Sequence, residues 1–367
     1  MKKLTLFLFA LLLIWGCNNQ SKNDTIKIGA ILPLTGDAAA WGIPPKNGAT
    51  LAVEQINANG GILGKKVELI VEDGGCDPKM GVNSINKLLS ANKPVAVVGA
   101  VCSAVTLAVA PVVEKNKVVL ISPASTSPDI TDAGDYVFRV IPSDGLRAKV
   151  FAKYIISLGY KTAAVLTINN VAGKAAEQSF EKYFTEDGGK VLGVETYTPD
   201  ANTVKTQLTK IQEMKPDIIL ALSQVKDAVI VLKNVKELNI KIPLFFQSEA
   251  LDDPSVVQNA GDAANGATYI TFAKNDNQEA INFAQAYKKR FGVEPKLFAP
   301  EAYDAVMLIA KGLKKIGEVN SIKLHNELYA VKNYQGASGT LSFDENGDVV
   351  KPLNIKIIEN EVPIIIK

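Results

Sequence analysis

The chain has 367 residues, with 40 basic and 38 acidic side chains and a formal net charge of +2. Loss of residues 1–16 would remove two lysines and no acids, which leaves 38 side chains of each sign. A near-neutral chain without a basic cluster interleaved with aromatics is not expected to bind nucleic acid. About 350 residues exceed one ordinary hydrophobic core, so we expect two domains.

Residues 1–16 have the features of an export signal. Two lysines precede an apolar run that is too short for an ordinary membrane-spanning helix and is typical of a secretory signal. Gly16 before Cys17 resembles a lipobox, in which the cysteine becomes lipidated, and a plain signal peptide with an incidental cysteine is the alternative. Residues 17–25 are polar and predict a tether. We therefore expect an exported protein that a lipid on Cys17 holds at a membrane.

Strand and helix patterns alternate after the tether, which predicts parallel sheets covered by helices. In the first unit we expect strands at 26–34, 66–72, 95–99 and 118–121, and helices at 48–58 and 82–89. After residue 142 the pattern restarts, with strands at 162–168, 191–197, 217–222 and 243–247, and helices at 148–158, 175–185, 203–214 and 228–238. Two similar α/β units therefore follow one another.

The rest of the chain does not repeat this unit. A short strand at 269–272 precedes three helices, at 279–291, 302–316 and 322–331, and strands at 340–343 and 353–358 close the chain. We expect the helices to cover the first unit and the last strands to complete the second. The prediction is two Rossmann-like lobes with parallel central sheets, residues 26–141 with 272–342 and residues 142–271 with 343–367. Several crossovers make a hinge, and a hinge between two lobes makes a cleft that can close on a ligand.

Small hydroxyl residues follow two successive strands of the first unit. Cys102 and Ser103 come after the strand that ends at Gly99, and the segment 122–127 follows the next strand. Ligands bind at the carboxyl ends of strands in open parallel sheets, and a helix N-terminus attracts negative charge. The sequence therefore predicts a place to hold a carboxylate.

Cys76 and Cys102 remain once Cys17 is assigned to lipid. An even pair in an oxidising compartment is expected to form a disulfide, with two buried free thiols as the alternative.

An enzyme is not expected. Cys102 or Ser103 would need a nearby base to act as a nucleophile, and the single histidine, His325, lies in a predicted helix far along the chain. One histidine and a disulfide do not supply the ligands of a zinc site, and no dinucleotide-binding fingerprint follows the first strand. We expect neither metal nor cofactor. A third possible class of function, beside a solute-binding protein for transport and an enzyme, is a sensor that signals to a partner whether its ligand is bound.

Several motifs, in this order and spacing, resemble the type I periplasmic binding proteins of the branched-chain amino acid group over nearly all of residues 26–360. They are Gly29-Ala30-Ile31-Leu32-Pro33-Leu34-Thr35-Gly36, Ile56-Asn57-Ala58-Asn59-Gly60-Gly61-Ile62, Glu72-Asp73, Cys76-Asp77-Pro78, Cys102-Ser103, Ile121-Ser122-Pro123-Ala124-Ser125-Thr126 and Tyr303-Asp304-Ala305. The resemblance implies a monomer that delivers an amino acid to an ABC permease. It also implies a disulfide between Cys76 and Cys102.

The resemblance implies a role for each site residue. Ser103 and Thr126 match positions that hold the ligand carboxylate, while the Ala124 carbonyl and Thr126 hydroxyl face the ammonium, with Ser125 in the same segment. Glu249 matches the carboxylate that neutralises the ammonium when the lobes close. Trp41, in the loop after the first strand, matches an aromatic that packs on the ligand side chain.

Each of these residues also has a purely structural alternative. Ser103, where a helix N-cap is expected, would only cap the helix, Thr126 would satisfy a turn, Glu249 would be a solvated loop acid and Trp41 would cover the core.

The second lobe departs from the family pattern at two positions. Val171-Ala172-Gly173 stands where relatives carry Tyr-Gly, and Gln224 lies near the position of a second cleft aromatic. The amino-acid frame is kept, but the side-chain pocket differs. The alternative ligands are a polar amino acid, an amide or urea.

Overall fold

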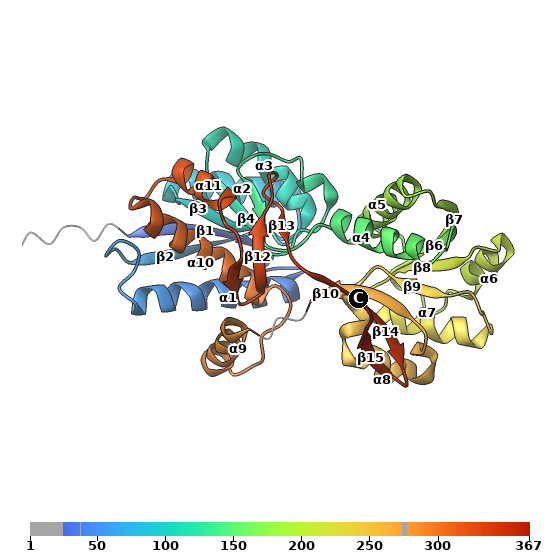
Figure 1. Cartoon of the computed structure of the whole chain (residues 1–367). Coiled ribbons are helices and arrows are strands. Elements are labelled where there is room, and N and C mark those ends of the chain that lie inside the picture. The colour runs from blue at the N-terminus through green and yellow to red at the C-terminus, as the bar shows by residue number, and fades with distance from the viewer. Residues whose placement is uncertain (1–24, 37, 274–276) are drawn as a thin grey trace, which may run out of the picture.

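The computed structural model describes residues 25–36, 38–273 and 277–367, without the side chains of residues 171, 172 and 249. The predicted export signal and Cys17 lie outside the described residues. Two α/β lobes lie side by side, each built on its own sheet (Figure 1). The predicted fold class is therefore confirmed. None of the helices in the described ranges combines the length and apolarity that crossing a membrane requires.

Lobe 1 contains a five-stranded parallel sheet in the order β2-β1-β3-β4-β5. The strands are β1 (Ile26–Leu32), β2 (Val67–Asp73), β3 (Ala96–Gly99), β4 (Val119–Ser122) and β5 (Val137–Arg139). The helices between them are α1 (Ala39–Ala58), α2 (Pro78–Lys87), the π-helical η1 (Leu88–Asn92), α3 (Ser103–Asn116) and the short 3₁₀ turn η2 (Pro128–Ile130). Continuous apolar runs form β3 and β4 because helices bury both faces of a parallel sheet.

Three late helices cover lobe 1, as the sequence predicts: α9 (Gln278–Phe291), α10 (Ala299–Ile316) and α11 (Ser321–Tyr329). Apolar residues of α10 share one core with Val98 of β3 and Ile121 of β4. Helix α1 begins at Ala39, earlier than predicted, and continues through Pro44 and Pro45. Both prolines are buried, so tertiary packing outweighs their local cost to the helix.

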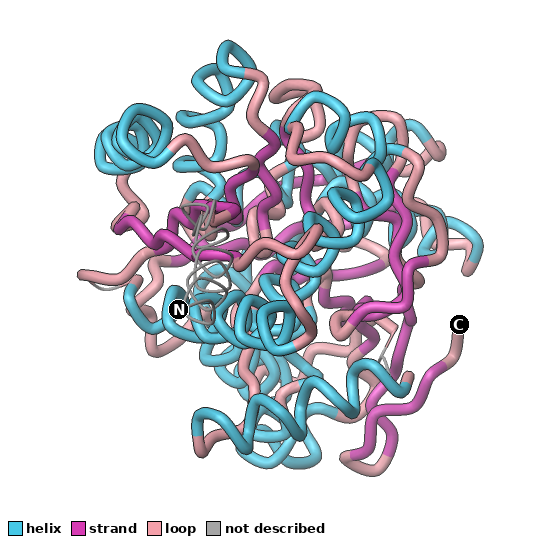
Figure 2. The backbone as a smooth tube through the Cα atoms, turned by 90° about the vertical axis from the view of Figure 1, so that its left-hand side faces the viewer, coloured by secondary structure: helices cyan, strands magenta, loops and turns pink. Residues whose placement is uncertain are grey.

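Lobe 2 contains a seven-stranded sheet in the order β15-β14-β10-β9-β8-β6-β7. Strands β6 (Thr162–Ile168), β7 (Lys190–Tyr197), β8 (Ile218–Leu222), β9 (Leu244–Phe246) and β10 (Thr268–Phe272) pair in parallel, whereas β14 (Leu353–Glu359) and β15 (Val362–Ile365) pair antiparallel. The helices are α4 (Asp144–Ser157), α5 (Val171–Glu186), α6 (Lys205–Met214), α7 (Val225–Glu237) and α8 (Pro254–Ala260), with short 3₁₀ turns η3 (Glu249–Asp252) and η4 (Gly261–Ala264). In Figure 2, lobe 1 faces the viewer with helices around its strands, and the strand next to the C-terminus lies at the outer edge of the molecule.

Three connections between described elements join the lobes: from β5 to α4, from β10 to α9, and from a small sheet of lobe 1 to β14. That small sheet comprises β11 (Tyr334–Gly336), β12 (Gly339–Phe343) and β13 (Val349–Val350). Phe343 and Val349 pack in the core of lobe 1, so the last crossover follows β13, later than the predicted boundary after residue 342. The segment between β13 and β14 runs from one lobe to the other in Figure 1.

Candidate ligand-binding site

The N-terminus of α3 lies at the carboxyl end of β3. Cys102, with an extended backbone, is the N-cap and Ser103 is the first helical residue, so the predicted cap position of Ser103 is wrong by one residue. The Ser103 Oγ accepts a hydrogen bond from the Ser127 N–H at 3.3 Å. Within the described residues, the N–H groups of Ser103 and Ala104 donate to no acceptor, as is usual for the first turn of a helix. These donors carry partial positive charge that suits an anion.

A disulfide joins Cys76 to Cys102, with 5.4 Å between the Cα atoms, as the sequence predicts. It ties the loop after β2 to the N-cap of α3. In the same loop region, the Asp73 carboxylate accepts hydrogen bonds from the Leu34 N–H and the Thr35 hydroxyl. Burial acts to raise the pKa of Asp73, but these hydrogen bonds outweigh it and the pKa is lowered. The loops after β1, β2 and β3 are thus fastened to one another.

Ser122 and Ser125 build the loop that follows β4. The buried Ser122 hydroxyl donates to the Ala100 carbonyl at 2.7 Å and accepts from the Ser125 N–H at 2.9 Å. The Ser125 hydroxyl, in a residue that is 1% exposed, lies 3.0 Å from the same carbonyl and 2.8 Å from the Thr106 hydroxyl. The Ser125 hydroxyl therefore ties the loop after β4 to the segment after β3 and to α3, and its part in ligand binding stays a prediction.

Thr126 differs from Ser125 because it is only half-buried. No hydrogen bond from its N–H group or its hydroxyl is found in the described part of the chain, whereas its carbonyl accepts from the Asp144 N–H at 2.9 Å. The neighbouring Ala124 is buried in a small cluster with Leu32 and Val101. Thr126 therefore offers two donors beside the N-terminus of α3.

The predicted residues of lobe 2 all follow parallel strands of one sheet. Val171 begins α5 after the cap residue Asn170, Gln224 is the exposed N-cap of α7, and Glu249 begins η3. They come after β6, β8 and β9 respectively, so they lie at the carboxyl edge of the lobe 2 sheet. The side chains of Val171 and Glu249 are not described.

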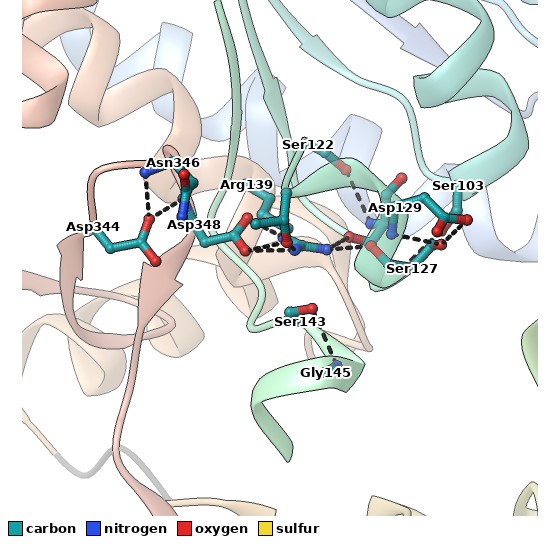
Figure 3. A network of polar contacts seen from close by, with 12 residues as sticks. Ser103, Ser122, Ser127, Asp129, Arg139, Ser143, Gly145, Asp344, Asn346 and Asp348 are labelled. Carbon is teal, nitrogen blue, oxygen red and sulfur yellow. Dashed lines mark hydrogen bonds and ion pairs between the residues drawn. The ribbon is translucent and has the colours of Figure 1, made fainter. Parts of the chain in front are cut away.

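Helix α4 brings this edge next to the Thr126 loop. The Asp144 N–H, at the start of α4, donates to the Thr126 carbonyl of lobe 1. One turn later, the Arg147 guanidinium lies 4.7 Å from the ring centroid of Phe272, the last residue of β10. The carboxyl ends of the two sheets therefore meet where the chain first crosses between the lobes. Figure 3 shows the first turn of α4, with Ser143 and Gly145, beside the segment that contains Ser127.

Trp41 lies inside α1 rather than in the loop that the sequence predicts, because the helix begins at Ala39. Its side chain is 54% exposed, so the described structure does not use it to cover the core. Its contact with a ligand stays a prediction.

Gln247 is a buried polar residue that sequence reasoning did not select. It directly follows β9 and is 5% exposed, and its side-chain amide has no hydrogen-bond partner among the described residues. Its position as the last residue of the predicted strand 243–247 could have indicated a polar group at the carboxyl end of that strand. A buried amide without a partner is costly, so Gln247 marks a polar spot at this edge of lobe 2.

A separate polar hollow lies beside His325. His325, on α11, stacks on Tyr136 with 4.3 Å between ring centroids. It borders a hollow of about 550 Å³ that includes none of the predicted site residues; the lining consists of Asp135, His325, Tyr329, Lys332, Asp344 and Glu345. In the described ranges, no three or more His, Cys, Asp or Glu residues are grouped to hold a metal ion.

The chain is similar to periplasmic binding proteins over nearly its whole length. The family model described as "Periplasmic binding protein" matches residues 25–358. A leucine-, isoleucine-, valine-, threonine- and alanine-binding protein from Pseudomonas aeruginosa is 31% identical over 347 residues, which cover 93% of this chain and 92% of the relative. A Leu/Ile/Val-binding protein homolog from Brucella melitensis is 30% identical, with 89% of each chain covered.

A solved structure from Streptococcus pneumoniae shows the same fold. It is a branched-chain amino acid transporter substrate-binding protein in complex with isoleucine, is 29% identical and superimposes with a TM-score of 0.74. The match covers 92% of this chain and 97% of that one.

Proposed function

The chain belongs to the family of periplasmic binding proteins, and from this premise we propose that it binds leucine, isoleucine or valine between its two lobes for an ABC importer. Relatives that bind these amino acids match over nearly the whole chain, which supports the ligand class. The fold of the described residues supplies two lobes joined by three connections, and the Asp144–Thr126 hydrogen bond joins the loop after β4 to the start of α4.

The proposed binding begins on lobe 1. The ligand carboxylate accepts hydrogen bonds from the N-terminus of α3, the Ser103 hydroxyl and the Thr126 N–H, which the partial positive charge of the helix end favours. The Ala124 carbonyl and the Thr126 hydroxyl accept from the ammonium. Glu249 of lobe 2 then meets the ammonium as the lobes close, and Trp41 packs on the aliphatic side chain.

The setting of the protein is part of the proposal. The apolar run before Cys17 supports export, and the Gly16-Cys17 pair supports a lipid anchor at the outer face of a membrane. An open empty form and a closed liganded form present different surfaces, so a permease can select the loaded protein. We propose that the protein works as a monomer without enzymatic activity.

One observation carries the proposal: Ser103 and Thr126 on lobe 1 keep donors that meet no acceptor among the described residues, and the Asp144–Thr126 hydrogen bond joins their side of lobe 1 to the first helix of lobe 2. We propose that a ligand whose carboxylate is held there contacts residues that follow strands of both sheets. Binding in that position gives both lobes a share of one ligand, which is the requirement for ligand-driven closure.

Calorimetric titration of leucine into the full chain, purified in detergent, tests the proposal. We expect binding to the wild-type chain and a loss of about tenfold in affinity for Ser103→Ala, the size expected for one hydrogen bond to a charged group. Ser90→Ala is the control, because the exposed Ser90 hydroxyl bonds only to backbone carbonyls of its own helical segment. Normal leucine affinity in Ser103→Ala would contradict the assigned site, and binding of polar amino acids alone would contradict the ligand class.

A further inference from the structure

Arg139 is a fully buried charged residue at the end of β5. Its Nε donates to Asp348 Oδ1 at 2.5 Å and its Nη2 donates to Asp348 Oδ2 at 2.6 Å, a two-point ion pair. The Thr131 hydroxyl accepts from the same Nη2 at 2.8 Å and donates to Asp348 Oδ2 at 2.7 Å. Figure 3 shows these contacts as one network that extends toward Ser127.

The third guanidinium nitrogen of Arg139, Nη1, reaches the loop that carries Thr126. It donates to the Ser127 carbonyl at 2.7 Å and lies 3.4 Å from the Ser125 carbonyl. These two carbonyls flank Thr126. The Ser125–Thr126 peptide is trans, so its N–H points opposite to its carbonyl. Because that carbonyl faces Arg139, the Thr126 N–H is turned away from the guanidinium.

Asp348 connects this loop to the last crossover. It lies just before β13, and its N–H is fixed by the Asp344 carboxylate at 2.9 Å. The Arg139 N–H also donates to the Gly347 carbonyl at 3.1 Å. The loop after β4 is therefore fastened to the segment from which the chain leaves lobe 1.

We propose that Arg139 is a positioning residue for ligand binding: paired with Asp348, it holds the 125–127 loop so that Thr126 presents its N–H to the ligand carboxylate. This inference rests on the function proposed above. A buried ion pair does not by itself add stability over apolar side chains of similar size, so stability alone does not account for the network. The two flanking carbonyls give it a specific task, the orientation of one peptide group.

Thr131 allows a mild test that keeps the ion pair. Thr131→Val removes the hydroxyl that bridges Arg139 and Asp348 at nearly constant volume, and Thr131→Ser keeps it. The stronger variant Asp348→Asn removes the negative partner. The control is Glu114→Gln, because the Glu114 carboxylate accepts from the Tyr136 N–H at the opposite end of β5. Calorimetry on the full chain would compare leucine with leucinamide, which lacks the carboxylate.

We expect Thr131→Val and Asp348→Asn to weaken leucine binding by about fivefold or more, the equivalent of one misplaced hydrogen bond, and to lower the preference for leucine over leucinamide. Thr131→Ser and Glu114→Gln should retain the wild-type preference. A merely structural role would lower the melting temperature of the variants but leave this preference unchanged.

The outcomes separate this inference from the proposed function. If the wild-type chain binds leucine and Thr131→Val keeps both the affinity and the preference, the positioning role is wrong while the function stands. If the wild-type chain binds no amino acid, the function is wrong and the inference falls with it. If Asp348→Asn does not fold, the comparison of Thr131→Val with Thr131→Ser still tests the positioning role.

Discussion

At the scale of single residues, the hydroxyls that follow β4 divide into two groups. Those of Ser122 and Ser125 bond to the Ala100 carbonyl after β3, whereas Thr126, like Ser103 after β3, keeps donors that meet no acceptor in the described residues. The sequence predicts the whole segment as a ligand site because all these residues are small and polar. The Ser125 hydroxyl is taken up by hydrogen bonds to the Ala100 carbonyl and the Thr106 hydroxyl. These partners lie far from Ser125 in the sequence, so no local pattern indicates that this hydroxyl has a structural partner.

Arg139 shows a second limit of prediction from single residues. An arginine at the end of an apolar strand is typical of an exposed strand end, yet this side chain is fully buried. Its partner, Asp348, lies 209 residues away in the sequence. The pairing forms because the segment before β13 lies beside the end of β5, whereas the sequence predicts that the chain has already left lobe 1 by residue 343.

Near the last crossover, one buried cation faces two buried carboxylates. Lys351 donates to the Ser338 hydroxyl at 2.7 Å, and Asp304 accepts from the Ala337 and Ser338 N–H groups at 2.7 Å each. Glu301 Oε2 has no hydrogen-bond partner among the described residues. Burial raises the pKa of Glu301, with Lys351 opposing the shift, and burial likewise raises the pKa of Asp304. Glu301 is therefore the less well satisfied of the two acids.

We predict that Glu301→Gln stabilises the protein at pH 7. The folded-state pKa of Glu301 lies above its ordinary value of 4.5, so wild-type stability falls as the pH rises from about 4.5 through the folded-state pKa. Glutamine does not ionise and avoids this loss. We expect a melting temperature roughly 2 °C higher at pH 7, the shift typical of about 1 kcal/mol at this size, and a gap that closes toward pH 4.5.

Thermal melts of both chains between pH 4.5 and pH 7.5 check this prediction. The control is Glu294→Gln, since Glu294 forms an exposed ion pair with Lys288 and should leave the melting temperature unchanged. A lower melting temperature for Glu301→Gln at pH 7 would show instead that the Glu301 charge stabilises Lys351.

At the scale of elements, most strands and helices are predictable because apolar runs and helical periods alternate clearly. Strand β6 has the predicted bounds, Thr162–Ile168. The start of α1 is not predictable, because Pro44 and Pro45 indicate a helix that begins after them, and burial overrides that signal. The short strands β11, β13 and β15 are stabilised by pairing with neighbouring strands, and their own residues carry little pattern.

The disulfide acts on the element that we propose to hold the ligand, because Cys102 is the N-cap of α3. We predict that replacing both Cys76 and Cys102 with serine costs about 3 kcal/mol in the chain-entropy model for a separation of 26 residues. The same change should weaken leucine binding, since it loosens the first turn of α3. Urea unfolding and calorimetry measure the two effects.

Wild-type protein in a reducing agent is the matched comparison. It should reproduce the unfolding midpoint of the double serine variant, and the reductant should leave the variant itself unchanged. An equal midpoint for oxidised and reduced wild-type protein would rule out a stabilising disulfide.

At the scale of the whole molecule, the two-lobe plan is predictable because two series of alternating strands and helices are followed by three helices without strands between them. The position of the last crossover is less predictable. Strands β12 and β13 pair with each other within lobe 1, so the chain leaves lobe 1 after β13 and not after residue 342. The first and last crossovers are fastened to the loop that we propose as the ligand site, through Asp144 and through Asp348 with Arg139. We therefore predict that binding on lobe 1 and closure of the lobes are coupled.

Small-angle X-ray scattering of the full chain with and without saturating leucine measures this coupling. We expect a smaller radius of gyration with leucine for the wild-type chain. We expect a reduced contraction for Glu249→Ala, which lacks the lobe 2 carboxylate proposed to meet the ammonium. Leucine binding with an unchanged radius of gyration in the wild-type chain would contradict a ligand site shared between the two lobes.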